Sequence, residues 1–180
     1  MITDMALDPI SNQLFFLYED AATSRRRAPF GRPFPVIQRL DEGGGAPSPV
    51  YMLSNSSEVP TSLALDPQTK TLFFASNGKL SNNARSLGGL FAVSYDGSSF
   101  RPIGRALRND TQAIHSLQYA KGSLYYVLRS GSTSKIVRFD IEKKTQVVIS
   151  SSFAPSQVLT VERDSNVDLW VRDTEGNFYL

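Results

Sequence analysis

Apolar and polar residues alternate along this chain in short runs, and one such pattern occurs four times. Residues 5–9 (MALDP) followed by 14–16 (LFF) return as residues 63–67 (LALDP) followed by 72–74 (LFF). Weaker copies begin at 117–119 (LQY) with 124–126 (LYY), and at 159–161 (LTV) with 169–171 (LWV). Because alternation with a period of two is typical of half-buried strands, each copy predicts a strand, a turn and an aromatic-rich second strand.

Two further strands are predicted between successive copies. Residues 36–41, 90–96 and 136–140 occupy one equivalent position, and each run ends at an aspartate before a turn. Residues 50–53, 100–103 and 146–149 follow as a fourth strand. Four antiparallel strands in a repeat of roughly 40–50 residues are typical of a β-propeller blade.

The fold class predicted from these repeats is all-β, with no helix. We expect a partial β-propeller of about three and a half four-stranded blades from a six-bladed type of ring. The blades are predicted at about residues 1–58, 59–111, 112–153 and, incomplete, 154–180. A β-sandwich is the alternative, but it does not explain why one strand pair returns four times. Since closure protects sheet edges, we expect the remaining blades or a second chain to complete the ring, and the sequence to be a fragment if they belong to the same chain.

Composition narrows the possible partners. Hydrophobic residues make up 41% and charged residues 20% of the chain, which is typical of a globular protein. A formal net charge of +2 gives no reason to expect nucleic acid, and no run approaches the ~20 apolar residues of a membrane span. The absence of cysteine excludes disulfides and thiolate metal sites from these residues.

Two N-x-[ST] sequons begin at Asn55 and Asn109. Both lie in the connection between the fourth strand of one blade and the first strand of the next. This shared position predicts glycosylation if the protein is secreted, and chance recurrence in serine-rich loops is the alternative.

The repeat resembles two six-bladed propeller families of the TolB-like type. Residues 64–67 (ALDP), 72–74 (LFF) and 92–97 (AVSYDG) follow the order of the YWTD, or LDL-receptor class B, repeats, although Asp173 is the only acidic residue at the last position of that tetrapeptide. Residues 107–110 (LRND), 122–126 (GSLYY) and 168–171 (DLWV) resemble the yellow and major royal jelly family. Both resemblances imply an extracellular binding protein, secreted or part of a membrane-protein ectodomain.

One mouth of the propeller channel is the predicted ligand site. His115, the single histidine, aligns with Thr3, Thr61 and Gln157, each just before an inner strand, although a solvated loop histidine is the alternative. Side chains from several blades meet at such a mouth, as a ligand site requires. The residues predicted to line it are Thr61, His115, Arg129, Gln157 and Arg172.

Arg25, Arg26 and Arg27 lie in the longest predicted insertion and are placed on the rim of this face. Guanidinium groups pair with carboxylates, so they predict an acidic partner. A solvated loop or a processing site are the alternatives. The face as a whole comprises the loops at residues 18–34, 77–88, 105–113 and 129–134.

The sequence predicts no catalytic residue and no cofactor. The predicted function is binding of a protein or a small molecule. A metal-dependent hydrolase of the gluconolactonase or esterase kind, with calcium in the channel, is one alternative, but the channel positions Asp4, Ser62 and Ser116 offer no carboxylate cluster. A purely structural scaffold is another alternative. The aspartates before proline, Asp8 and Asp66, are predicted to be turn residues.

Overall fold

The described part of the chain consists of strands, turns and bends. The computed structural model describes residues 2–18, 34–53, 60–76, 80–81, 84–85, 88–104, 112–151, 154–163 and 166–180. No helix occurs in these ranges, and so none with the length and apolar character that crossing a bilayer demands.

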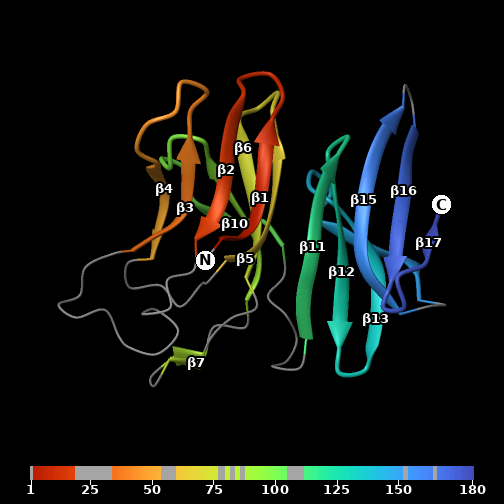
Figure 1. Ribbon diagram of the computed structural model, residues 1–180. Coiled ribbons are helices and arrows are strands. Elements are labelled where there is room, and N and C mark those ends of the chain that lie inside the picture. The colour runs from red at the N-terminus through yellow and green to blue at the C-terminus, as the bar shows by residue number, and fades with distance from the viewer. Residues whose placement is uncertain are drawn as a thin grey trace.

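The strands form antiparallel sheets in chain order, each built as a propeller blade (Figure 1). Blade 1 contains β1 (Ile2–Asp8), β2 (Gln13–Tyr18), β3 (Phe34–Leu40) and β4 (Ser48–Leu53). Blade 2 contains β5 (Pro60–Asp66), β6 (Thr71–Ser76), β9 (Gly89–Ser94) and β10 (Arg101–Pro102), with the small hairpin of β7 (Leu80–Ser81) and β8 (Ala84–Arg85) inserted after β6. Blade 3 contains β11 (Gln112–Ala120), β12 (Ser123–Ser130), β13 (Thr133–Asp140) and β14 (Thr145–Ser150). Blade 4 contains β15 (Pro155–Arg163), β16 (Asn166–Asp173) and β17 (Phe178–Tyr179). The predicted all-β partial propeller is confirmed.

The apolar core is divided among the contacts between blades. Successive residues of a strand point to opposite faces, so Phe73 packs towards blade 3 while Phe74 packs towards blade 1. One cluster joins blades 1 and 2, a second joins blades 2 and 3, and a smaller third joins blades 3 and 4. The predicted core role of the aromatic second strands is confirmed for blades 1 to 3, whereas Trp170 of blade 4 is 38% exposed.

The first strand of each blade is the innermost one, and these strands lie side by side. β5 lies against both β1 and β11, and β11 lies against β15. Each inner strand carries a bulge near its start, where its register with the second strand shifts. The bulge turns the following polar residue towards the neighbouring blade.

Hydrogen bonds cross from blade to blade at these bulges. The Asp4 carboxylate accepts from the Ser62 hydroxyl (2.9 Å) and from the Leu63 amide (2.8 Å). The Ser62 hydroxyl in turn accepts from the Leu117 amide at 2.9 Å. Ser116 accepts from the Val158 amide and donates to the Val158 carbonyl. The polar residues expected to face the channel therefore join the blades together.

Aspartates close the turns after the inner strands. Asp8 accepts from the amides of Ile10 and Ser11, and Asp66 accepts from the Gln68 amide. The interpretation of these residues as turn aspartates is confirmed.

Candidate functional site

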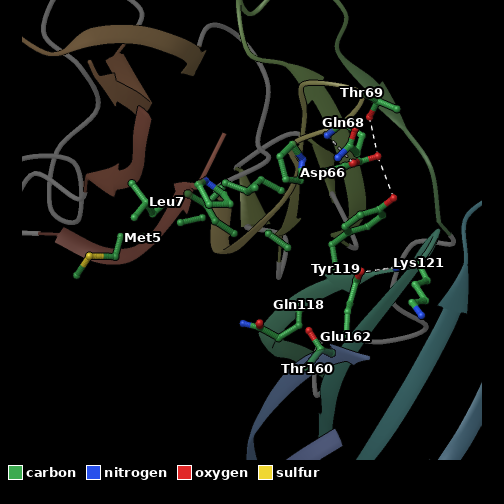
Figure 2. Close-up of a pocket in the computed structure, with 16 residues that line it drawn as sticks. Met5, Leu7, Asp66, Gln68, Thr69, Gln118, Tyr119, Lys121, Thr160 and Glu162 are labelled. Atoms are coloured by element: carbon green, nitrogen blue, oxygen red, sulfur yellow. Dashed lines mark hydrogen bonds between the residues drawn. The ribbon is translucent and has the colours of Figure 1, made fainter. Parts of the chain in front are cut away.

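A cleft of about 810 Å³ runs along the inner strands of all four blades (Figure 2). Met5 and Leu7 of β1 lie on one side of it, and Asp66, Gln68 and Thr69 lie on the other. The cleft is lined by the second halves of the inner strands and by the turns that follow them. The lining residues are Met5, Ala6, Leu7, Pro9, Leu63, Ala64, Leu65, Asp66, Pro67, Gln68, Thr69, Gln118, Tyr119, Lys121, Thr160 and Glu162.

The Asp66 carboxylate in the wall of the cleft is fully engaged. It accepts from the Gln68 amide at 3.0 Å, the Thr69 hydroxyl at 2.7 Å and the Tyr119 hydroxyl at 2.9 Å. Burial, together with the hydrogen bond to Asp66, raises the pKa of Tyr119 to about 12. Tyr119 thus remains a neutral donor that joins blade 3 to blade 2, and Asp66 is not left free to act as a base.

The two other charged residues of the cleft are also engaged. The Lys121 amide donates to the Glu162 carboxylate at 3.0 Å, and the Lys121 ammonium group donates to the Arg163 carbonyl at 3.3 Å. These contacts link the end of β11 to β15. The charges therefore stabilise the contact between blades 3 and 4.

Three neutral side chains of the cleft retain their hydrogen-bonding capacity. The side chains of Gln68, Gln118 and Thr160 make no hydrogen bond within the described ranges. An amide side chain both donates and accepts, and so does a hydroxyl. The cleft thus combines apolar walls with uncharged hydrogen-bonding groups, which is an arrangement that orients a ligand without fixing its charge.

The predicted mouth residues gather at the opposite end of the inner strands. Thr61, His115 and Gln157 lie near the starts of β5, β11 and β15. Arg129 and Arg172 lie near the ends of β12 and β16, which run antiparallel to the inner strands, so they reach the same end. All five side chains are exposed, and none of them lines the cleft.

Some of these mouth residues interact with their neighbours. Neighbouring atoms partly desolvate the His115 ring and lower its pKa, and the nearby Arg129 charge lowers it further, which favours a neutral imidazole. The Arg172 guanidinium lies 5.9 Å from the centre of the Phe178 ring. The Thr61 hydroxyl donates to the Ala75 carbonyl at 3.2 Å.

The predicted alignment of Gln157 with Thr61 is wrong by one residue. The register of β15 with β16 skips Ser156, as that of β5 with β6 skips Thr61. Gln157 therefore corresponds to Ser62. Both strands carry the same bulge, so the offset comes from the turn that follows: Thr160 pairs with Leu169 as Leu65 pairs with Leu72, and the longer connection in blade 4 shifts the alignment of β15 by one residue.

Arg25, Arg26, Arg27, Asn55 and Asn109 lie outside the described residues. The described ranges contain no group of three His, Cys, Asp or Glu side chains that could hold a metal ion.

Gln118 and Thr160 were not predicted as site residues. The signal that marks Gln118 is the repeat itself, because a glutamine stands where blades 1 and 2 have Ala6 and Ala64.

Comparison with known proteins finds structures with a similar fold but no family to which the chain can be assigned. No protein-family model matches the chain, and no curated protein matches it. A nidogen/laminin complex structure has a TM-score of 0.67 at 16% identity, over 96% of this chain and 56% of that chain. TolB from Acinetobacter baumannii has a TM-score of 0.62 at 12% identity, over 99% of this chain and 42% of that chain. A GH74 enzyme from Niastella koreensis has a TM-score of 0.63 at 15% identity, over 99% of this chain and 29% of that chain.

The chain thus spans about half the length of the nidogen structure and less of the other two. At these identities the likeness concerns the propeller fold alone, which occurs in binding modules and enzymes alike. Membership of the YWTD or yellow families, and a ring of six blades, stay predictions.

Proposed function

We propose that this chain is a binding module that holds an uncharged, hydrogen-bonding ligand in the cleft along its inner strands. The ligand is a segment of a partner protein or a small molecule. The observation that carries this proposal is the combination of three free neutral side chains, Gln68, Gln118 and Thr160, with apolar walls and engaged charges. The charged groups of the cleft already hydrogen-bond to neutral groups of the protein, so the neutral side chains are the ones left to bind a ligand.

Two considerations support binding. Inner strands of four different blades contribute to one cleft, and such convergence of elements is a common origin of ligand sites. The nidogen structure with a similar fold is that of a complex with laminin.

The mouth residues form a second part of the proposal, as a contact surface for the same partner or another. They are Thr61, His115, Arg129, Gln157 and Arg172.

We place the module outside the cell, in a secreted protein or a receptor ectodomain. The support is the resemblance to extracellular propeller families and the shared position of the sequons at Asn55 and Asn109. If this is right, glycosidase treatment of natively secreted protein lowers its mass. An unchanged mass contradicts the glycosylation.

Peptide selection tests the cleft. Phage displaying random dodecapeptides are selected on the immobilised chain, and the selected peptides are then measured by calorimetry. We expect the Gln118→Ala/Thr160→Ala double variant to weaken them at least tenfold, because about 1 kcal/mol is lost with each hydrogen bond. Ser132→Ala, in an exposed turn outside the cleft, is the matched control and leaves binding unchanged. If the selected peptides bind both variants with equal affinity, they bind outside the cleft.

Binding measured at increasing salt concentration tests whether the rim holds an acidic partner. If Arg25, Arg26 and Arg27 bind an acidic partner, replacing all three by alanine weakens a poly-glutamate probe, and the wild-type affinity falls as salt is added. A salt-independent affinity contradicts this part of the proposal.

The enzyme alternative predicts that calcium binds in the channel. Calcium would then raise the melting temperature of the chain, and a chelator would lower it. A melting temperature unchanged by either addition favours the binding module.

The scaffold alternative predicts that peptide selection on the cleft yields no ligand and that His115→Ala and Arg172→Ala leave partner binding intact.

A further inference from the structure

The inner strand of each blade has one edge that pairs with no other strand in the described ranges. β1, β5, β11 and β15 each stand at the end of their sheet, and residues of all four line the cleft. In an antiparallel pair, every second residue points its N–H and C=O groups away from the partner strand. These outward groups need another partner, because an unpaired backbone group shielded from water is costly.

Side chains of the preceding blade identify one row of outward groups. In blades 2, 3 and 4, the amide of one inner-strand residue donates to such a side chain at 2.8–2.9 Å. These amides therefore point away from the second strands, and we call them the occupied row. The amides and their acceptors are Leu63 with Asp4, Leu117 with Ser62, and Val158 with Ser116.

A second row of outward groups lies two residues further along each inner strand. It consists of Leu7, Leu65, Tyr119 and Thr160, and we call it the open row. All four residues lie at the same level, because each one pairs with the leucine that recurs in the second strands. All four also line the cleft (Figure 2).

The hairpin of blade 3 gives the same direction independently. Lys121 and Gly122 form a two-residue turn with φ values of +45° and +74°. The residues that close such a turn, Ala120 and Ser123, form a hydrogen-bonded pair. The preceding residue, Tyr119, therefore points its N–H and C=O groups away from β12 and towards the cleft.

The protein supplies no partner for the open row within the described ranges. No hydrogen bond from a described residue reaches the backbone groups of these four residues. Leu65 and Tyr119 belong to blades 2 and 3, which have a neighbouring blade on both sides. The row is thus open in the middle of the chain and not only near its ends.

The occupied row shows which chemical group satisfies such a backbone pair. The Ser116 hydroxyl accepts from the Val158 N–H at 2.9 Å and donates to the Val158 C=O at 3.0 Å. One hydroxyl thus serves both groups, because the same oxygen donates and accepts. The Ser62 hydroxyl likewise accepts from the Leu117 amide while it donates to another blade.

Addition of a peptide strand fits the open row less well. Strand addition requires successive outward pairs along one strand. In blades 1 to 3 the next outward position is Pro9, Pro67 or Lys121. The prolines have no N–H group, and the Lys121 amide already donates to Glu162. In these blades the open pairs are therefore arranged across the strands, with one pair on each.

We propose that the ligand of the cleft is a neutral oligosaccharide whose hydroxyl groups bridge the N–H and C=O groups of the open row. This names the ligand class of the proposed function and rests on it. Hydroxyls repeated around sugar rings match backbone pairs repeated around the inner strands. Leu65 and Pro67 offer apolar surface to the C–H face of a sugar ring, and the Gln118 and Thr160 side chains add further polar contacts.

NMR titration of the isotope-labelled chain tests the proposal. The probes are maltohexaose, cellohexaose and mannohexaose, with trigalacturonic acid as a charged analogue. We expect at least one neutral hexasaccharide to shift the amide signals of Leu65, Tyr119 and Thr160. The amides of Leu63 and Leu117, which already have acceptors, should shift less. If no hexasaccharide shifts the open row more than the occupied row, the proposal is overturned.

Two variants of Thr160 separate the backbone contact from the side-chain contact. Thr160→Val removes the hydroxyl alone, whereas Thr160→Pro also removes the N–H group. That N–H points away from β16, so the proline breaks no hydrogen bond of the sheet, and circular dichroism should confirm the fold. We expect Thr160→Pro to bind the hexasaccharide about tenfold more weakly than Thr160→Val. Equal affinities of two folded variants contradict the proposal, and the titration of the wild-type chain does not depend on either variant.

The same measurements distinguish this proposal from the proposed function. If selected peptides bind in the cleft and no hexasaccharide does, the carbohydrate proposal is wrong and the binding module stands. If neither kind of ligand binds, both are wrong. Binding of trigalacturonic acid as strongly as the neutral sugars overturns the preference for an uncharged ligand.

Discussion

Single aspartates hold the turns and contacts of this propeller because each accepts several hydrogen bonds. Asp173 accepts from the amides of Glu175 and Asn177, from the Asn177 side chain and from the Tyr179 hydroxyl. Asp66 accepts from its own turn and from Tyr119 of the next blade. One side chain thus fixes both a local turn and a contact between distant segments.

Replacing Tyr119 by phenylalanine tests the contact to Asp66. We expect the free energy of unfolding to fall by about 1–2 kcal/mol, because a hydrogen bond to a carboxylate is lost while Thr69 still donates to the same oxygen. Urea unfolding measures the change. Tyr18→Phe, at an exposed position, is the control and changes stability by less than ~0.5 kcal/mol. Equal effects of both replacements contradict a stabilising role for the bond.

Lowering the pH tests the hydrogen bonds that the Asp173 carboxylate accepts in its turn. The donors around it, the Asn177 side chain first, lower the pKa of Asp173 to about 2, below its value in an unfolded chain. A carboxylate with a lowered folded pKa stabilises the fold above the unfolded value, and this stabilisation is lost as the pH falls from about 4 towards about 2. The Asn177 amide signal in NMR spectra should follow this transition, and Asp173→Asn should remove it. A midpoint near the ordinary value of about 4 contradicts the network.

At the scale of elements, blades approach so closely at some turns that only glycine fits. Gly97 follows β9 with a φ of +79°, and a Cβ atom there would lie 2.3 Å from the Val50 carbonyl oxygen of blade 1. Gly122 has a similar φ of +74° with no atom within 4 Å of its Cβ position. The two turns share their backbone conformation and differ in the neighbouring blade.

Alanine at these two glycines separates local strain from blade packing. Gly122→Ala should lower the free energy of unfolding by about 1 kcal/mol, which is the usual penalty of positive φ. Gly97→Ala should lower it by roughly 3 kcal/mol, because the backbone of blade 1 must also move away. Urea unfolding of both variants provides the comparison. Equal losses would show that the contact between blades 1 and 2 yields easily at this point.

At the scale of the whole molecule, stability depends on contacts between neighbouring blades. Blade 2 shares a core cluster with each of its two neighbours, whereas blade 4 contributes only Val158 and Val171 to the buried part of its cluster. In arrays of this kind each unit is stabilised mainly by its nearest neighbours. The described core therefore predicts that blade 4 opens before blade 2.

Hydrogen exchange followed by mass spectrometry tests this order. Amides of β15 and β16 should exchange faster than those of β5 and β6. Val171→Ala should accelerate exchange in blade 4 alone, while Leu72→Ala in the centre should accelerate it in several blades. Uniform protection across all blades would indicate a single cooperative unit.

The sequence by itself determined the strands and their grouping into blades. Alternation at residues 5–8 and 63–66, the aromatic second strands and the turn aspartates are local features, and local chemistry is sufficient to place them.

Tertiary structure decided which residues meet between blades. The bulge in each inner strand adds one residue, and with a side-chain period of two such a shift exchanges the faces of the strand. The longer connection between β15 and β16 also places Gln157, and not Ser156, at the position equivalent to Ser62. Gln118 and Thr160 line the cleft although the sequence did not predict them as site residues. Burial also depends on the neighbour, so Trp170 and Phe73 follow the same pattern in the sequence and differ only because blade 3 covers Phe73.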